Sequence, residues 1–316
     1  MNAPEAKVFK ASTSLLGRAA ESISNILLGK DQQVRLALTC LVARGHLLIE
    51  DLPGVGKTTL AHTLAQVMGL DFQRIQFTSD LLPADVLGVA IYNQSRGAFE
   101  FHKGPVFTNC VLADEVNRAT PKTQSALLEA MEEHQVSVEG ETHELPKPFF
   151  VIATQNPEHH IGTYALPESQ LDRFLMRIHI GFPGKEAERA LLSGEDRRQM
   201  IDSITPVTDA GKLLTIQRQA TLVHVSDALL DYVQAILAFT RETAHFSVGL
   251  SPRGGLGLVN AARAMALIDG QDFVLPEHIK EVLPAVVDHR LELIGDAQGQ
   301  SAGKPSEFIM ESVAIS

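Results

Sequence analysis

The sequence predicts an α/β fold in which a mostly parallel sheet, flanked by helices, is followed by an all-helical domain. Short apolar segments alternate with helical segments in the first part of the chain, which is typical of a parallel sheet. A glycine-rich turn joins the first of these strands directly to a helix. After Phe182-Pro183-Gly184 the strand signals nearly stop and helical runs dominate. The chain is therefore divided into an α/β domain, residues 1–183, and a helical domain, residues 184–316.

The α/β domain is expected to begin with helices between Ala19 and Val42, which carry apolar residues at helical spacing and are interrupted at Gly29-Lys30. The first predicted strand is followed by a helix over Thr58–Met68, and a later helix starts at Pro121 with Thr120 as its cap. Five short apolar segments are the predicted strands of the sheet: Leu47–Glu50, Arg74–Phe77, Val111–Asp114, Phe149–Thr154 and Met176–Ile180.

The helical domain is predicted from runs of apolar residues at helical spacing. The polar segment Gly295–Ser306 near its end is expected to be loosely held. The predicted helices of this domain are Lys185–Arg198, Ser226–Thr243, Gly254–Ile268 and Glu277–Leu293.

Composition limits the classes of function. The chain has 316 residues, 45% of them hydrophobic, and a net charge of -11, so it is expected to repel nucleic-acid backbones. Cys40 and Cys110 lie in apolar runs, where a buried free thiol is the preferred interpretation. The start of the chain lacks an apolar signal core, and no run approaches the roughly 18 apolar residues of a membrane span. A cytoplasmic location is the expectation.

The segment Gly54-Val55-Gly56-Lys57-Thr58 lies where the first strand passes into a helix, so backbone N–H groups and the helix N-terminus converge on one point. Lys57 is expected to reach the β and γ phosphates of a nucleotide, and the Thr58 hydroxyl to bind magnesium. The general pattern G-x-x-x-x-G-K-[ST] requires glycine where this chain has Asp51. The alternative is an ordinary glycine-rich turn, which the flanking strand and helix disfavour.

Acidic residues end the strand Val111–Asp114. Asp114 is expected to hold magnesium through its water shell, and Glu115 to polarise the attacking water as general base. A strand end with two solvated acids is the alternative. Asn156 follows the next apolar strand, at the sheet edge where ligands of open α/β sheets bind, and is expected to orient the water and contact the γ phosphate. An Asn that forms a turn before a proline is the alternative there.

These features, in this order, resemble the AAA+ superfamily, and longer stretches between Leu28 and Leu293 resemble its MoxR branch. The resemblance implies a P-loop NTPase core with β-hairpin insertions, followed by an all-α lid. It also implies ATP/ADP and Mg2+ as cofactors. The acidic residue Asp51, at the first position of the phosphate loop, resembles the residue that this branch has there. The stretches that carry the resemblance are TSDLLPADVLG, GAFEFHKGPVF, LADEVNRATPKTQSALLEAMEE, FFVIATQNP and LPESQLDRFLMR.

The resemblance also implies roles for residues outside these strands. Arg173 is similar to an arginine finger that acts on the neighbouring subunit's γ phosphate in a hexameric ring, and a surface Asp-Arg pair is the alternative. Arg253 resembles the sensor-2 arginine that contacts ATP from the lid; an exposed first-turn arginine is the alternative. The resemblance further implies that Leu28 and Gly29 form part of the adenine pocket. The full set of implied nucleotide-binding residues is Leu28, Gly29, Pro53, Gly54, Val55, Gly56, Lys57, Thr58, Thr59 and Arg253.

Two alternating segments, Val89–Phe101 and Gln135–Leu145, indicate β-hairpins with turns near Ser95-Arg96-Gly97 and at Glu139-Gly140. The family places such hairpins near the client or the pore of the ring. Structural ribbons without a partner are the alternative.

The leading functional hypothesis is a MoxR-type ATPase that remodels a protein partner, by maturation or cofactor insertion. Family members commonly act with von Willebrand factor A domain proteins, and that partner would be a separate polypeptide. Two alternatives stay open: an ATP-gated assembly scaffold with little turnover, and a nucleic-acid-dependent AAA+ motor. The neighbours His159 and His160 lack the spacing of a metal site.

Overall fold

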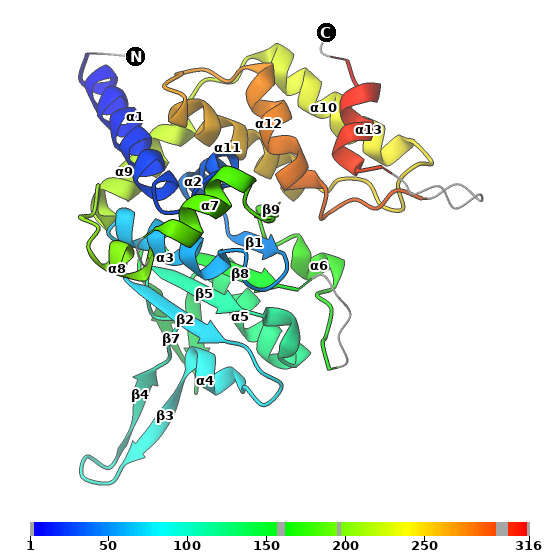
Figure 1. Cartoon of the computed structure of the whole chain (residues 1–316). Helices are drawn as coiled ribbons and strands as arrows, with labels where there is room; N and C mark the ends of the chain where they lie inside the picture. The colour runs from blue at the N-terminus through cyan, green and yellow to red at the C-terminus, as the bar shows by residue number, and fades with distance from the viewer. Residues whose placement is uncertain (1–2, 157–161, 195–196, 295–302, 315–316) are drawn as a thin grey trace.

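The computed structural model describes residues 3–156, 162–194, 197–294 and 303–314, so His159 and His160 lie outside the described residues. Its central sheet has five parallel strands, as predicted. These strands are β1 (Leu47–Glu50), β2 (Phe72–Gln76), β5 (Cys110–Asp114), β8 (Phe150–Gln155) and β9 (Met176–Ile178). Their order across the sheet is β2-β5-β8-β1-β9 (Figure 1).

The strand order determines which side chains meet at one edge of the sheet. Strands β5 and β8 are adjacent and in register, with Cys110 beside Phe150, and β1 lies between β8 and β9. All residues of β5 are buried, which explains why it appears in the sequence as a continuous apolar run rather than an alternating one. Because the strands are parallel, Glu50, Asp114 and Gln155 end at the same edge.

Separate hydrophobic cores cover the two faces of the sheet. In β5, Leu112 belongs to one core, whereas Val111 and Ala113 belong to the other, as the alternation of a strand requires. The helices that surround the α/β part are α1 (Ala3–Ser24), α2 (Asp31–Val42), α3 (Lys57–Val67), α4 (Pro83–Leu87), the 3-10 turn η1 (Val116–Arg118), α5 (Pro121–Glu133) and α6 (Glu168–Leu171).

The N-terminal helix α1 is longer than predicted, because it begins at Ala3 rather than Ala19. Phe9, Leu16 and Ile23 are all buried and lie seven residues apart, so they form one apolar stripe along the helix. Serine, threonine and glycine between them have weak helix propensity, which hides this pattern in the sequence. Packing of the stripe supplies the stability that propensity does not.

Seven helices form the second half of the chain within the described ranges: α7 (Lys185–Ser193), α8 (Arg197–Asp202), α9 (Ala210–Leu222), α10 (Asp227–Glu242), α11 (Pro252–Ile268), α12 (Pro276–Val287) and α13 (Pro305–Ser312). The helical character of this half was predicted, although α9, α13 and most of α8 were not. Asp209 caps α9 by accepting the Lys212 N–H at 2.9 Å.

The segment expected to be loosely held, Gly295–Ser306, lies partly outside the described residues. Its end differs from the expectation, because Ser306 is fully buried in α13. The Asp288 carboxylate accepts hydrogen bonds from the Ser306 N–H at 2.8 Å and from its hydroxyl at 3.0 Å. These contacts attach α13 to the end of α12.

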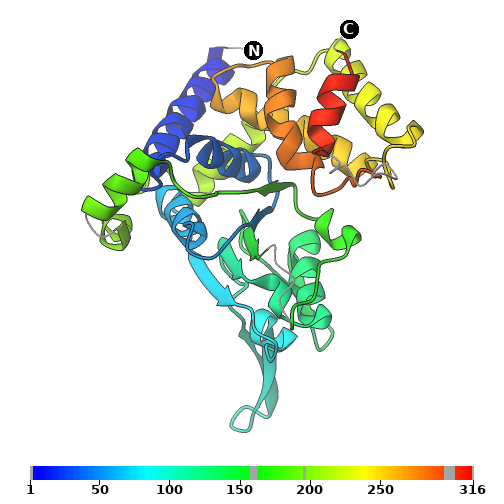
Figure 2. The same cartoon turned by 45° about the vertical axis from the view of Figure 1, so that its right-hand side comes forward.

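One hydrophobic core joins the sheet to both α1 and the second half. It contains Leu47 and Ile49 of the sheet, Leu16 of α1 and Leu258 of α11. Polar contacts follow the same interface, since Arg35 of α2 forms an ion pair of 2.9 Å with Asp269 just after α11. Figure 2 shows α1 and α2 beside the helices of the second half. The N-terminal helices therefore pack on both parts, and the boundary at residue 183 stays a prediction.

Both predicted hairpins are present. β3 (Gly88–Asn93) pairs with β4 (Ala98–Lys103), and β6 (Gln135–Val138) pairs with β7 (Glu141–Glu144). Glu139 and Gly140 have φ values of 50° and 81°, the left-handed turn that a two-residue hairpin requires. The β3–β4 hairpin projects from the end of the molecule opposite the second half (Figure 1). No helix in the described ranges combines the length and apolar character of a membrane crossing.

Candidate functional site

The loop between β1 and α3 has the backbone conformation of a phosphate cradle. Gly54 and Gly56 have φ values of 87° and 101°, a region that side chains rarely adopt. A side chain at Gly56 would also approach Leu27 to 3.2 Å. Gly56 is the residue before α3, so its conformation directs the first N–H groups of the helix into the loop. The loop can therefore present several N–H donors to one anion.

A cavity of about 400 Å³ opens beside this loop. It contains most of the nucleotide-site residues expected from the sequence, together with two that were not expected, Arg74 and Gln76 of β2. Val55 is buried beneath the loop. The complete lining is Pro53, Gly54, Gly56, Lys57, Thr58, Thr59, Arg74, Gln76, Asp114, Glu115 and Asn156.

Lys57 is the cation at the centre of this cavity. Its side chain is largely buried, and its Nζ donates hydrogen bonds to the Asp51 carbonyl oxygen and, at 3.1 Å, to Asn156 Oδ1. Burial lowers the pKa of Lys57, while the charges of Asp114, Asp51 and Glu115 oppose that shift. A buried ammonium group is stabilised by an anionic ligand, which the adjacent N–H groups are positioned to bind.

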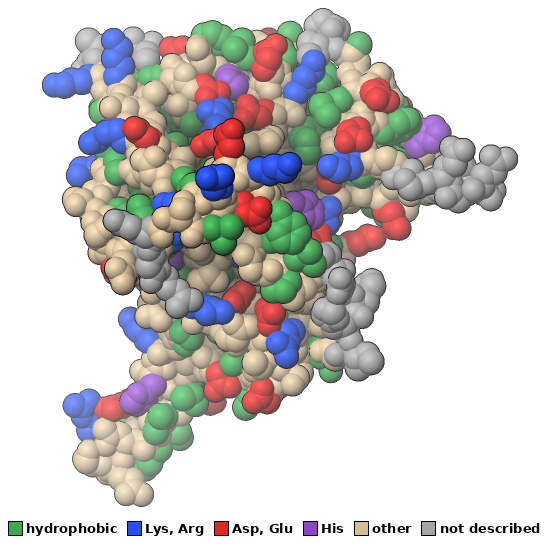
Figure 3. Space-filling model, in the orientation of Figure 1, with side chains coloured by type: hydrophobic (Ala, Val, Ile, Leu, Met, Phe, Trp, Pro, Cys, Tyr) green, Lys and Arg blue, Asp and Glu red, His purple; other side chains and the backbone are tan. Residues whose placement is uncertain are grey.

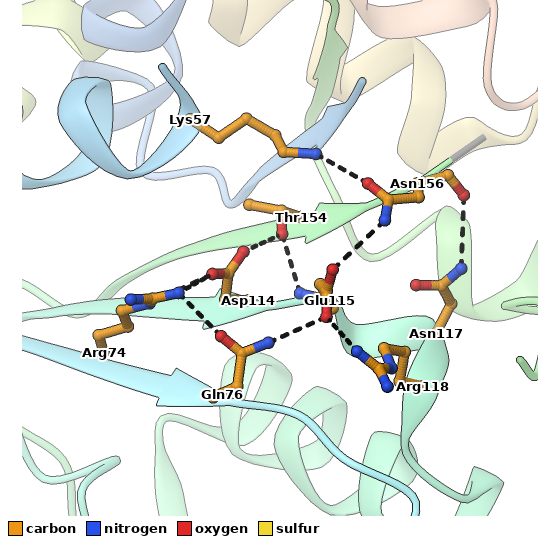
Figure 4. Close-up of polar contacts among 9 residues, drawn as sticks. All are labelled: Lys57, Arg74, Gln76, Asp114, Glu115, Asn117, Arg118, Thr154 and Asn156. Atoms are coloured by element: carbon orange, nitrogen blue, oxygen red, sulfur yellow. Dashed lines mark hydrogen bonds and ion pairs between the residues drawn. The ribbon is translucent and has the colours of Figure 1, made fainter. Parts of the chain in front are cut away.

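Asp114 is held at the end of β5 by two partners. Thr154 of β8 donates its hydroxyl to Asp114 Oδ1 at 2.6 Å, and Arg74 of β2 donates Nε–H to Oδ2 at 3.2 Å (Figure 4). The residue is buried, yet it lines the cavity opposite the exposed Thr58. One carboxylate and one hydroxyl therefore face the same space, a donor set that suits Mg2+ when phosphate oxygens and water complete it.

Glu115 has a strained backbone that turns its side chain toward the cavity. Its φ of 59° and ψ of 49° are left-handed, a conformation that costs about 1–2 kcal/mol for a residue with a side chain. The Glu115 N–H donates to Thr154 Oγ1 at 2.9 Å, which fixes this turn. Three donors then hold the carboxylate: Arg118 at 2.9 Å, Gln76 at 3.1 Å and Asn156 at 3.3 Å.

Asn156 connects the lysine to the acid. Its Oδ1 accepts from Lys57 and its Nδ2 donates to Glu115 Oε1, so one amide group joins the phosphate loop to the end of β5 (Figure 4). The Asn117 side chain donates to the Asn156 carbonyl oxygen at 3.4 Å. Each end of the amide has a partner of the matching type, which defines the orientation of the group.

Five residues of this network were missed by sequence reasoning: Arg74, Gln76, Asn117, Arg118 and Thr154. Arg74 and Gln76 are two apart on β2, so they lie on one side of the strand. That alternation was visible in the sequence. The pairing of β2 with β5 was not, because the two strands lie far apart in the chain. The position of Arg74 beside Asp114 therefore depended on the strand order.

Arg173 and Arg253 lie outside the cavity lining, and both contact Glu132 near the end of α5. Arg173 forms an ion pair of 3.0 Å with Glu132 and donates to the Leu128 carbonyl oxygen at 2.7 Å. Arg253 forms its ion pair with the other oxygen of the same carboxylate. The structure thus places Arg253 with the predicted finger at Glu132, outside the lining of the cavity beside the phosphate loop.

Leu28 and Gly29 also lie outside the cavity lining, in the turn between α1 and α2. A side chain at Gly29 would meet Ala187 of α7 at 3.2 Å, while the neighbouring Leu27 borders Gly56. The turn is therefore next to the phosphate loop and α7, as an adenine pocket would require, and the role itself stays a prediction. The described residues contain no cluster of three or more His, Cys, Asp or Glu suited to a metal.

A phosphate loop after β1, an Asp-Glu pair at the end of β5 and an asparagine after β8, followed by a helical part, define an AAA+ ATPase. Comparison with known families agrees. Residues 46–176 match the ATPase family associated with various cellular activities (AAA), and residues 238–312 match the AAA lid domain.

Individual relatives specify the branch. An uncharacterized protein of Bacillus subtilis, YeaC, is 46% identical over 303 residues, which is 95% of each chain. The chaperone MoxR1 of Mycobacterium tuberculosis is 43% identical over 301 residues, covering 91% of this chain and 78% of MoxR1. The crystal structure of a protein assigned as an ATPase from Cytophaga hutchinsonii aligns with a TM-score of 0.87 and 37% identity, over 98% and 97% of the two chains. The chain belongs to the MoxR family of AAA+ ATPases.

Proposed function

We propose that this protein hydrolyses ATP with Mg2+ in the cavity beside α3 and uses the reaction to remodel a protein partner. The observation that carries the proposal is the side-chain connection from Lys57 through Asn156 to Glu115. It links a group suited to bind phosphate with a carboxylate suited to activate water, and both groups line one cavity. If Lys57 and Glu115 were unrelated solvated side chains, there would be no reason for the Asn156 amide to bind both of them.

The residues that would hold the nucleotide follow from this arrangement. The N–H groups around Gly54 and Gly56 and the Lys57 ammonium bind the phosphates. Thr58 and Asp114 would hold the magnesium ion, which supplies charge neutralisation between the phosphates. Glu115 accepts a proton from the attacking water, and Asn156 orients that water. Leu28 and Gly29 would border the adenine.

The two arginines at Glu132 support a ring in which one subunit completes the site of the next. Arg173 and Arg253 do not line the cavity of their own chain, and we propose that they act on a phosphate bound by the neighbouring subunit. Head-to-tail contacts of this kind close into a ring when the rotation permits, and we propose a hexamer. Arg173 is the arginine finger, and Arg253 acts beside it.

The partner is proposed to be a protein. MoxR1 is described as a chaperone. In this chain the projecting β3–β4 hairpin exposes apolar side chains, which Figure 3 shows on its surface. Ile91, Tyr92 and Phe99 are 49%, 52% and 70% exposed, more than a solvated ribbon needs. A von Willebrand factor A domain protein is one candidate client, and the cytoplasm is the proposed location.

Phosphate release by the Glu115→Gln variant tests the proposal. The variant should bind ATP and lose about 10² to 10⁴ of the turnover rate, because it cannot accept a proton. Glu242→Gln, which changes an exposed carboxylate at the end of α10, is the matched control and should hydrolyse ATP normally. Background release by the unaltered chain under every condition, with or without partners, would favour the scaffold interpretation instead.

A further inference from the structure

Asp51 occupies the first position of the phosphate-loop pattern, where glycine is usual. Its carboxylate is directed toward the chain after β9. One oxygen, Oδ2, accepts hydrogen bonds from the consecutive N–H groups of Ile180 and Gly181, at 2.7 and 2.6 Å. The other, Oδ1, accepts from the Leu52 N–H at 2.9 Å. A carboxylate bound by three backbone N–H groups is held much more firmly than an exposed side chain.

The backbone of Asp51 has two further contacts, both to the catalytic network. Its N–H donates to the Gln155 carbonyl oxygen at 3.2 Å, at the end of β8. Its carbonyl oxygen accepts from Lys57 Nζ. The same residue therefore contacts the lysine that binds phosphate, the strand that carries Asn156 and the segment after β9.

The segment that Asp51 holds leads into the second half of the chain. Ile180 and Gly181 are followed by Phe182, Pro183 and Gly184, after which α7 begins. Gly181 has a φ of 66°, and this conformation allows two consecutive N–H groups to converge on one anion. Lys30 adds a second attachment, because its Nζ donates to the Phe182 carbonyl oxygen at 2.7 Å.

We propose that Asp51 is a positioning residue that fixes the connection between β9 and α7 to the phosphate loop. The proposal rests on the ATPase function proposed above. In a chain with the usual glycine, the Ile180 and Gly181 N–H groups would lose their acceptor and the loop would lose its attachment to the connection. Asp51 therefore sets both the placement of Lys57 and the orientation of α7 relative to the sheet.

Three variants test the proposal, with the full chain as reference. Asp51→Gly restores the usual pattern and removes the carboxylate. Asp51→Asn keeps one oxygen for the Ile180 and Gly181 N–H groups but presents NH2 to Leu52. Asp231→Asn is the matched control, because Asp231 is exposed on α10. The effects should be ordered Asp51→Gly, then Asp51→Asn, with Asp231→Asn unchanged.

The first measurement separates binding from turnover. The Kd of a fluorescent ATP analogue should change by less than about threefold in Asp51→Gly, because the N–H groups of the loop remain. The kcat should fall by about tenfold or more, roughly the effect of one charge-assisted hydrogen bond on the placement of reacting groups. A purely structural role would instead lower the melting temperature and leave kcat per folded molecule unchanged.

The second measurement does not depend on nucleotide. Spin labels at exposed Lys122 of α5 and Leu192 of α7, introduced as cysteines, report the distance between the sheet and α7; the native Cys40 and Cys110 are buried. We expect a narrow distance distribution with Asp51 and a clearly broader one in Asp51→Gly. An unchanged distribution, or an unchanged kcat, overturns the proposal. Absence of ATP binding by the unaltered chain would instead refute the ATPase function, and the label distances would still decide the role of Asp51.

Discussion

Arg173 and Arg253 bind opposite oxygens of one carboxylate, that of Glu132. The first belongs to the α/β part and the second to the first turn of α11, so a single acidic side chain joins the two parts beside the predicted finger. Two guanidinium groups this close repel each other unless an anion lies between them. In the ring proposed above, the γ phosphate of a neighbouring subunit would supply a second anion at this position.

Mixing of variants tests action across the interface. Arg173→Ala and Glu115→Gln should each be inactive alone, since each ring lacks one component. After subunit exchange, an intact cavity from the first chain can meet an intact Arg173 from the second, at about one quarter of interfaces for random mixing in a closed ring. Phosphate release should therefore reappear. A mixture of Lys57→Met with Glu115→Gln, in which every cavity is damaged, is the control and should stay inactive.

Lys57 should determine whether ATP stabilises the fold. Burial lowers the pKa of Lys57, so an anionic ligand relieves an unfavourable environment. ATP at about 100 times its Kd should raise the free energy of unfolding of the unaltered chain by about 2.7 kcal/mol. Lys57→Met should lose this gain, whereas Lys122→Met on the exposed side of α5 should retain it. Thermal unfolding with and without ATP measures the difference, and a full gain in Lys57→Met would contradict the assigned role.

Arg74 should weaken the binding of magnesium. It contacts the oxygen of Asp114 that the Thr154 hydroxyl leaves free, and so competes with a cation for that carboxylate. The Arg74 side chain is half exposed, so solvent moderates the effect. In Arg74→Gln the Mg2+ concentration for half-maximal nucleotide binding should fall by about two- to tenfold, the effect of up to about 1.4 kcal/mol. An increased Mg2+ requirement would mean that Arg74 assists binding instead.

His46 should make the protein sensitive to acid. Its ring lies in the core, where Nδ1 accepts from the Val151 N–H at 3.0 Å and Nε2 donates to the Met131 carbonyl oxygen at 3.1 Å. Burial lowers the pKa of His46 from 6.5 to about 4. Below pH 6.5 the unfolded chain therefore binds a proton that the folded chain does not, and stability present above that pH is lost as the pH falls toward 4.

The expected loss from this residue is about 3 kcal/mol across that window. Urea unfolding at pH 7 and at pH 4.5 should show a smaller difference for His46→Gln than for the unaltered chain. Some acid dependence should persist, because burial also holds the pKa of His289 well below its usual value. Equal pH dependence of both proteins would show that His46 does not contribute.

The sequence was sufficient for features that depend on neighbouring residues. The five strands, both hairpins and the glycine loop before Lys57 are local patterns of apolar residues and turn residues, and the structure confirms these elements. Helix α1 was underestimated because its stripe of Phe9, Leu16 and Ile23 is sparse and is interrupted by Ser12-Thr13-Ser14 and Gly17, which have weak helix propensity. Burial against distant helices, which no local window contains, stabilises it.

Contacts between residues far apart in the chain could not be predicted from the sequence. Nothing near Glu132 in the chain indicates that it binds Arg253, because the two meet only when the fold brings the first turn of α11 to the end of α5. Likewise, Arg74 reaches Asp114 only because β2 is next to β5 in the sheet. Asp51 was noticed as a departure from a pattern, but its partners, Ile180 and Gly181, follow it in the chain only after the other four strands of the central sheet.

The hydrophobic core that joins α1, the sheet and the helices of the second half has a mechanical consequence. A chain with such a shared core has few internal hinges, so it should unfold in one cooperative transition. It should also rotate as a rigid body when its contact with a neighbouring subunit changes. Displacement produced at one subunit contact would then pass between the sheet and the helices of the second half without being absorbed on the way. In the ring proposed above, this stiffness would let a small change at a phosphate produce a larger displacement elsewhere.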